Sequence, residues 1–137
     1  MATLAIVGGL RGVTSRAELL GHRIHIVPDV DTDGRQIRVI DLPGIYSLDA
    51  GSLDERVTRD YLLSRDADLI VNVIDASNLE RHLYFSVQLL EMGVPLVIAL
   101  NMMDVARKRG IRLDEKRLAA ELGCPVVPVV AVSREGL

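Results

Sequence analysis

The sequence predicts an α/β domain whose sheet is mostly parallel, and three observations lead to this prediction. Short apolar runs alternate with helix-type patterns along the whole chain of 137 residues. The composition is 49% hydrophobic but only 3% aromatic, so Val, Ile, Leu and Ala must build the core, as in parallel sheets covered by helices. A length of 137 residues suits one compact domain. We therefore expect a single domain over residues 1–137 with about six strands, one of them an antiparallel edge strand.

Six short runs predict the strands. They cover residues 4–7, 23–27, 37–40, 69–74, 96–100 and 126–130. The second run alternates polar and apolar residues, as a half-buried strand does, and Asp33-Gly34 forms a strong hairpin turn before the third. The second and third strands should therefore be antiparallel neighbours. The fourth run is almost continuously apolar, which indicates a sheet covered on both faces.

Two amphipathic segments between these strands predict helices. The first covers residues 52–64, with Asp54 and Glu55 near its positive N-terminal end. The second begins at a capping box over residues 77–80 and should stop at Gly93. Its buried stripe should consist of Leu79, Leu83, Val87 and Leu90.

A third helix is expected over residues 114–122, where Gly123 closes it. Residues 15–20 can form an additional short helix after the first strand. In parallel sheets of this kind, ligands bind at the carboxyl ends of the strands. Four positions fall at or just after such ends, and they are Asp41, Asp75, Asn101 and Ala131. Their convergence predicts a binding site at this edge of the sheet.

The sequence Asp41-Leu42-Pro43-Gly44 follows the third strand directly. In a nucleotide site, the aspartate would hold Mg²⁺ through water, and the backbone N–H of the glycine would approach a terminal phosphate. The alternative interpretation is an ordinary Pro-Gly turn at the end of a strand.

The sequence Asn101-Met102-Met103-Asp104 follows the fifth strand. A carboxylate at Asp104 can accept two hydrogen bonds from the N1–H and N2–H₂ groups of guanine, while Asn101 holds a neighbouring loop and the base edge. Adenine lacks this pair of donors, so it would leave the carboxylate unpaired. The alternative interpretation is a polar start to a helix.

Together the two motifs are a much stronger signal, since they occur in the expected order with two helix–strand units between them. Four segments resemble the bacterial ferrous iron transport protein B family. They are Asp41–Leu48, Val73–Arg81, Ala99–Asp104 and Leu122–Val126. The resemblance runs from about Ile37 to Leu137, and Met102, in place of the lysine usual in this motif, points to this family rather than to GTPases generally.

The resemblance implies a three-layer Ras-like G domain that binds GTP and GDP with Mg²⁺, truncated before its final helix. In the family, a helical regulatory domain and a membrane region that moves Fe²⁺ follow this domain, which places it in the cytoplasm or on the cytoplasmic side of the inner membrane. The nucleotide site is expected to comprise Asn101, Met102, Asp104, Asp41, Leu42, Pro43, Gly44, Ala131, Val132, Gly8, Gly12 and Thr14. The expected Mg²⁺ ligands are Asp41, Thr14 and Ser15.

The phosphate-binding end departs from the family pattern, because no Gly-rich loop with lysine follows the first strand. Lys108 and Lys116 are the only lysines in the chain. In one alignment, residues 8–15 are a degraded phosphate loop in which Thr14 or Ser15 still meets Mg²⁺. In the other, residues 12–14 resemble the Gly-Val-Thr of switch I, and the phosphate loop is missing. The first is preferred because residues 15–20 can form a helix.

Two further departures concern the base and the attacking water. The Ser-Ala or Ser-Thr pair of the family is replaced by Ala131-Val132, so only a backbone N–H is left to reach the base oxygen unless Ser133 supplies the hydroxyl. Ile45 follows the first motif, and an apolar side chain cannot orient a water. The sequence therefore predicts guanine-nucleotide binding with hydrolysis weakened or absent. The alternative is a non-enzymatic pseudo-GTPase or fragment that acts through protein contacts at residues 45–65.

Composition and charge exclude several other classes of protein. The formal net charge is −3 and no basic block stands out, so nucleic-acid binding has no electrostatic support. The single cysteine, Cys124, fits a reducing compartment and should be a buried small hydrophobe. No stretch approaches the roughly 18 apolar residues of a membrane span.

Overall fold

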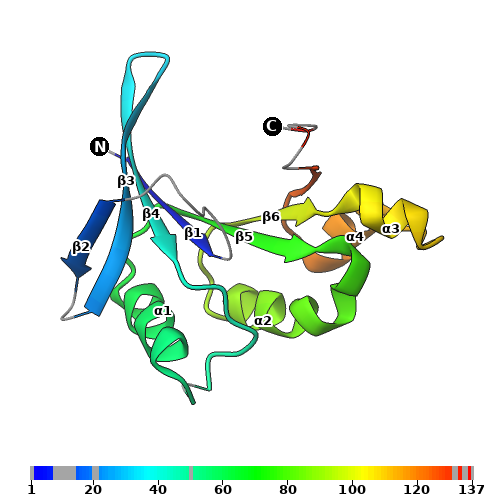
Figure 1. Cartoon of the computed structure of the whole chain (residues 1–137), viewed down its shortest axis with the longest axis horizontal. Helices are drawn as coiled ribbons and strands as arrows, with labels where there is room; N and C mark the ends of the chain where they lie inside the picture. The colour runs from blue at the N-terminus through cyan, green and yellow to red at the C-terminus, as the bar shows by residue number, and fades with distance from the viewer. Residues whose placement is uncertain are drawn as a thin grey trace.

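The computed structural model of the chain describes residues 2–7, 15–19, 22–49 and 51–130 together with residues 133 and 136. Strands and helices alternate along these residues (Figure 1). The elements are β1 (Ala2–Val7), β2 (Ser15–Leu19), β3 (His22–Thr32), β4 (Arg35–Leu42), α1 (Leu53–Ser64), β5 (Leu69–Asp75), the 3₁₀ turn η1 (Ala76–Asn78), α2 (Leu79–Glu91), β6 (Leu96–Asn101), α3 (Met103–Lys108), α4 (Glu115–Leu122) and β7 (Val126–Pro128).

The described strands form one sheet in the order β2-β3-β4-β1-β5-β6-β7. Strands β4, β1, β5, β6 and β7 run parallel to one another, and β3 is antiparallel to both of its neighbours. The mostly parallel α/β sheet predicted from the sequence is therefore confirmed. The described part of the sheet has seven strands rather than about six, because β2 adds one outside β3 and takes the edge position.

The prediction of a short helix at residues 15–20 is wrong. This segment forms β2, which pairs with β3 from Ser15 opposite Ile26 to Leu19 opposite His22. Its residues have good helix propensity, but about five residues are too few to form a stable helix without support. Hydrogen bonds to β3 therefore decide the conformation.

The predicted hairpin between the second and third expected strands is confirmed as the turn joining β3 and β4. Asp33 and Gly34 have φ angles of 53° and 74°, the left-handed pair that a type I′ turn requires. The turn brings Thr32 opposite Arg35 and makes the two strands antiparallel neighbours.

The helix caps also follow the sequence signals closely. At α1, the Ser52 hydroxyl accepts a hydrogen bond from the Glu55 N–H at 3.1 Å, and the Glu55 carboxylate accepts one from the Ser52 N–H at 2.9 Å. At α4, Asp114 caps the N-terminus and Gly123 closes the helix with a φ of 71°. The additional helix α3 begins at Met103, directly after β6, which agrees with the alternative interpretation of that motif as the polar start of a helix.

The capping box predicted for the second helix is wrong. The Ser77 hydroxyl and backbone N–H both donate to the Asp75 carboxylate, at 2.6 and 2.8 Å, so Asp75 caps η1 instead. Helix α2 begins after this turn, and its N-cap residue Asn78 makes no side-chain cap hydrogen bond. Because its hydroxyl and its N–H both bond to Asp75, Ser77 forms no capping box with Glu80.

The buried stripe predicted for α2 is only partly right, since Leu79 and Leu90 pack against the core but Val87 does not. The buried residues of the helix are Phe85, Ser86 and Leu89, whereas Val87 is 42% exposed. Two residues correspond to about 200° around a helix, so Val87 faces away from Leu89. A buried hydrogen bond fixes this orientation, because the Asn72 side-chain amide of β5 donates to the Ser86 hydroxyl at 3.0 Å.

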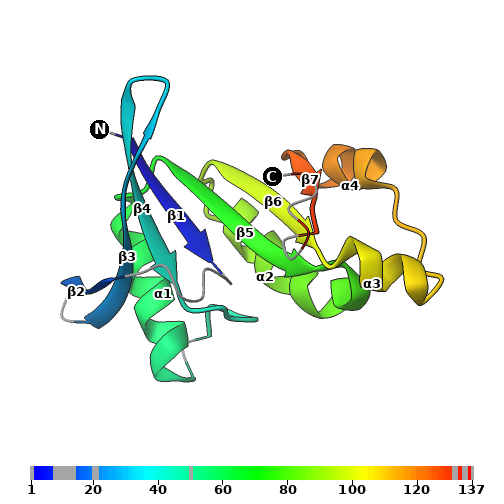
Figure 2. The same ribbon diagram turned by 45° about the horizontal axis from the view of Figure 1, so that its top comes forward.

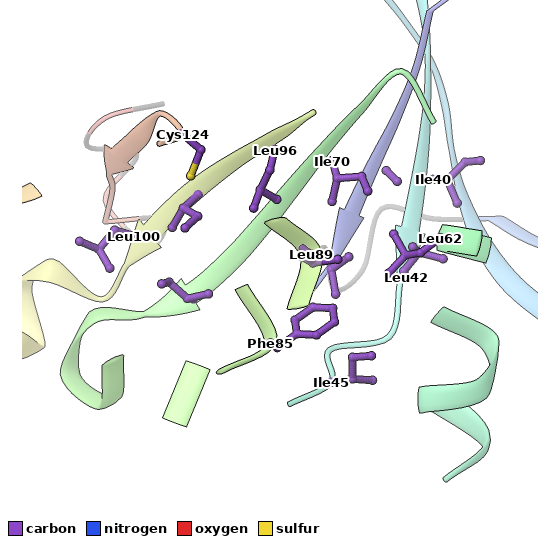
Figure 3. Close-up of a cluster of buried hydrophobic side chains, with 14 of the residues drawn as sticks. Ile40, Leu42, Ile45, Leu62, Ile70, Phe85, Leu89, Leu96, Leu100 and Cys124 are labelled. Carbon is purple, nitrogen blue, oxygen red and sulfur yellow. The ribbon is translucent and has the colours of Figure 1, made fainter. Parts of the chain in front are cut away.

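The main hydrophobic core lies between one face of the sheet and helices α1 and α2 (Figures 1 and 2). The register places Ala5 of β1 beside Ile40 and Ile70, and Ile70 beside Leu96, so these side chains share that face. Figure 3 shows Ile70 and Leu96 on the side of the sheet that faces Phe85 and Leu89 of α2. Met103 and Ala106 of α3 also belong to this core, and Leu122 of α4 packs against it. The sheet and the helices packed on it supply two of the three expected layers among the described residues.

Cys124 lies in this core with 8% exposure, as expected for a small hydrophobe. Burial raises the pKa of its thiol above the ordinary value, which makes it a poor nucleophile. No helix in the described part of the chain combines the length and apolarity that a membrane crossing needs.

Candidate functional site

The candidate site lies along the edge of the sheet where the parallel strands end, marked by the arrowheads of β1, β4, β5 and β6 in Figure 2. The register places Asp75, the last residue of β5, directly opposite Asn101, the last residue of β6. Asp41 lies near the end of β4, with β1 between it and β5. Neighbouring strands are about 4.8 Å apart. The two sequence motifs therefore meet the same edge of one sheet, three strand spacings apart, and the register sets Asp41 level with Val97, so that Asn101 lies further along the strand direction.

The second motif makes a sharp transition from strand to helix. Asn101 ends β6, Met102 adopts a left-handed conformation with φ 63° and ψ 30°, and α3 begins at Met103. The Met102 carbonyl accepts a hydrogen bond from the Ala106 N–H at 3.0 Å, which closes the first helical turn. A non-glycine residue in this region costs on the order of 1 kcal/mol, and such conformations cluster at binding sites.

Asp104 lies in the first turn of α3 and is half-buried. No hydrogen bond or ion pair engages its carboxylate within the part of the chain that the structure describes. A carboxylate that is partly removed from water gains from a partner with two donors. This arrangement suits the recognition of a guanine base edge.

The first motif ends β4 and turns into a segment held against the helices. Leu42 is buried, the Pro43 carbonyl accepts a hydrogen bond from the Thr58 hydroxyl at 3.1 Å, and Ile45 returns to the core. Figure 3 shows Ile45 on the same side of the sheet as Leu42. Gly44 is exposed between these two fixed neighbours. The exposed backbone of Gly44 is available to a ligand.

Asp41 is a half-buried carboxylate at this edge. Mg²⁺ keeps several waters and takes one or two carboxylates together with phosphate oxygens. One protein carboxylate with solvent access fits that mode of binding. Asp41 is therefore a described residue that could hold the ion.

Several predicted site residues are outside the described residues. They are Gly8, Gly12, Thr14, Ala131 and Val132. Ser15 begins strand β2 rather than a helix. The helical reason for preferring the degraded phosphate loop no longer holds, so both alignments stay open. The assignments of these residues to phosphate, base or Mg²⁺ stay predictions.

The sequence did not indicate how the segment after the first motif contacts α2. The Arg81 guanidinium lies 3.8 Å above the Tyr46 ring centroid, and the His82 ring centroid lies 5.2 Å from that of Tyr46. The Gln88 side-chain oxygen accepts a hydrogen bond from the Leu48 N–H at 3.0 Å. No spacing pattern could have predicted these contacts, because they join residues more than 30 positions apart.

The environment of His82 favours its neutral form. Burial lowers its pKa below the ordinary 6.5, and the nearby Arg81 charge adds to this effect. The Asp75 carboxylate acts in the opposite direction but does not reverse the shift. His82 is therefore an uncharged aromatic partner for Tyr46 near neutral pH.

Comparisons with known proteins agree on one family. The family profile of ferrous iron transport protein B matches residues 25–137. The Fe(2+) transporter FeoB of Escherichia coli K12 is 51% identical over 110 residues, which are 77% of this chain and 14% of the relative. The chain thus spans about one seventh of the length of the curated relatives it matches, since it covers 14% of them.

Solved structures of the same family resemble the whole described fold. The FeoB G-domain of Methanococcus jannaschii has a TM-score of 0.81 at 37% identity, and the match covers 99% of this chain and 91% of that one. The cytosolic domain of the T. maritima FeoB iron transporter in its GMPPNP form has a TM-score of 0.88 at 35% identity, with coverage of 99% and 59%.

Proposed function

The chain belongs to the ferrous iron transport protein B family, and from this premise we propose that it is a G domain that binds GTP and GDP. The observation that carries the proposal is the pairing of Asn101 at the end of β6 with the unengaged Asp104 carboxylate one helical turn later. Solved relatives also carry guanine nucleotides, as the GMPPNP form of the T. maritima protein does.

At the base end, Asp104 would accept hydrogen bonds from the N1–H and N2–H₂ groups of guanine, and Asn101 would hold the base edge. The left-handed Met102 sets the turn between them. Adenine presents no matching donor pair, so its binding would leave the half-buried carboxylate unsatisfied. Guanine selectivity is therefore expected to depend mainly on Asp104.

At the phosphate end, Asp41 would hold Mg²⁺ through water and Gly44 would donate its N–H to a terminal phosphate. The lysine usual at this end has no counterpart, since Lys108 ends α3 and Lys116 lies in α4. Losing one hydrogen bond to a charged group costs about 1.5–3 kcal/mol, or roughly 10- to 150-fold in affinity. We expect correspondingly weak nucleotide binding.

Hydrolysis is expected to be weak or absent. The side chain that follows Gly44 is Ile45, which is apolar, 7% exposed and part of the core. It cannot hydrogen-bond a water in line with the terminal phosphate, which is the task of the glutamine in many GTPases. Nucleotide binding would then act as a signal rather than drive a rapid catalytic cycle.

The curated relatives are Fe(2+) transporters and are far longer than this chain. We propose that the domain works next to a helical regulatory domain and a membrane region that moves Fe²⁺, on the cytoplasmic side of the membrane. Nucleotide occupancy would be transmitted to them through the segment after β4, because that segment joins the phosphate end to both α1 and α2.

A second candidate function is protein contact without nucleotide, through residues 45–65. Leu53 and Leu63 of α1 are 61% and 60% exposed, which favours this reading of the same segment. The two candidates differ in whether nucleotide binds at all.

Titration of the chain with fluorescent GDP and GTP, with and without Mg²⁺, separates the two candidates. The first predicts saturable binding that unlabelled GDP displaces and ADP does not, with slow or no release of phosphate from GTP. An absence of binding at millimolar nucleotide would refute it and leave the protein-contact function.

A further inference from the structure

The end of the first motif and the residues after it form a segment, residues 43–49, that two helices hold in place. From α1, the Thr58 hydroxyl donates to the Pro43 carbonyl at 3.1 Å. From α2, the Gln88 side chain accepts from the Leu48 N–H at 3.0 Å, and Arg81 stacks on the Tyr46 ring. We call residues 43–49 the anchored segment. Within it Gly44 is exposed, although its neighbours on both sides are fixed.

The Thr58 contact fixes more than the position of one carbonyl. The Pro43 carbonyl and the Gly44 N–H belong to the same peptide unit, which is planar and trans. In a trans peptide these two groups point in opposite directions. Because α1 holds the carbonyl, the Gly44 N–H must point away from α1 and out of the core.

Packing alone does not explain why the side chain at position 58 carries a hydroxyl. It is fully buried in α1, with 0% exposure, among valine, tyrosine and leucine side chains of the same helix face. A valine would have almost the same shape there. The hydroxyl makes one hydrogen bond outside its own helix, and that bond goes to the motif that ends β4.

We propose that Thr58 is a positioning residue for nucleotide recognition, which holds the Pro43–Gly44 peptide so that the Gly44 N–H faces the terminal phosphate of a nucleoside triphosphate. The inference rests on the proposed function. A diphosphate has no group at that place, so Thr58 contributes to triphosphate binding and leaves diphosphate binding unchanged. The residue therefore sets the preference between the two nucleotide states.

The test compares Thr58→Val with the wild-type chain by calorimetric titration of GMPPNP and GDP in Mg²⁺. The expected result is a loss of roughly 5- to 10-fold in GMPPNP affinity, about the net value of one ordinary hydrogen bond, because the Gly44 N–H is misaligned rather than removed, with GDP affinity unchanged. Thr58→Ser keeps the hydroxyl and should restore the GMPPNP affinity, which a purely structural role would not require.

Ser64→Ala is a matched control on the same helix. The Ser64 hydroxyl also donates to a backbone carbonyl, that of Tyr61, at 2.6 Å, but this bond lies within α1. Its removal should leave both nucleotide affinities unchanged. Equal losses for GMPPNP and GDP in Thr58→Val, or no loss for either, would overturn the proposal.

A second measurement does not need nucleotide. In the free protein, Thr58→Val should move the Gly44 amide resonance in a ¹⁵N correlation spectrum, and Ser64→Ala should not. If the wild-type chain bound neither nucleotide but Thr58→Val moved this resonance, the proposed function would fail while the hold on the peptide stood. An unmoved Gly44 resonance would show that Thr58 does not control this peptide.

Discussion

Replacing Asp104 with asparagine separates recognition of the base from stability of the fold. The carboxylate has no hydrogen bond or ion pair within the described residues, so the substitution breaks no contact there. It removes a negative charge from the first turn of α3, where the helix dipole makes such a charge worth about 0.3–1 kcal/mol. We therefore expect the free energy of unfolding to fall by less than about 1 kcal/mol.

The expected effect on guanine binding is larger. The side-chain oxygen of an asparagine at this position can accept one hydrogen bond from guanine, but its NH₂ group then faces the second donor of the base. Losing one hydrogen bond to a charged group costs about 1.5–3 kcal/mol, which corresponds to roughly 10- to 150-fold weaker GDP binding. Xanthine carries a carbonyl in place of the amino group, so XDP should bind the variant better than it binds the wild type.

The assay is competitive displacement of fluorescent GDP by GDP, XDP and ADP, with thermal unfolding measured on the same samples. Asp114→Asn is the matched control, because Asp114 caps α4 through the Arg117 N–H at 3.0 Å and lies outside the predicted site. It should leave the order of the three nucleotides unchanged. If Asp104→Asn keeps the wild-type preference for GDP over ADP while remaining folded, Asp104 does not read the base.

Three further predictions concern the fold. Tyr61→Phe should leave the protein equally stable or stabilise it by up to about 1 kcal/mol, because the Tyr61 hydroxyl is buried without a partner among the described residues and burial raises its pKa to about 12. Chemical denaturation measures this change, with Tyr84→Phe as the control because Tyr84 is 58% exposed. A loss of stability in Tyr61→Phe that Tyr84→Phe does not show would contradict the prediction. Burial lowers the pKa of His82 below 6.5, so its neutral form stabilises the fold fully above about pH 6.5, and this contribution is lost as the pH falls further. The difference in stability between wild type and His82→Gln should therefore shrink on acidification; a constant difference would contradict this. Ser52→Ala should cost about 0.5–2 kcal/mol by breaking the capping box of α1, and unchanged urea unfolding would refute that role.

Local signals in the sequence predicted most of the elements correctly. The Asp33-Gly34 turn and the Gly123 stop were predicted because each depends on residues within a few positions of it. The strand at residues 15–19 could not be predicted in this way, because its conformation depends on pairing with β3. The buried face of α2 likewise follows from the Asn72–Ser86 hydrogen bond across the core.

The candidate site also has features that the local sequence predicts and features that depend on packing between distant residues. Asp41 and Asn101 were predicted from their positions at strand ends, and the structure places both at one edge of the sheet. The contacts from Thr58 and Arg81 that hold the anchored segment were not predicted, because they join separate helices to a loop. Such contacts depend on how the elements pack, which no short motif encodes.

Guanine binding at the end of β6 is the central claim, and amide chemical shifts test it most directly. Addition of GDP with Mg²⁺ should shift the resonances of residues 101–106 in a saturable way, and ADP at the same concentration should not shift them. Absence of a shift at millimolar GDP, or the same shift with ADP, would contradict the assignment of this edge as a guanine site.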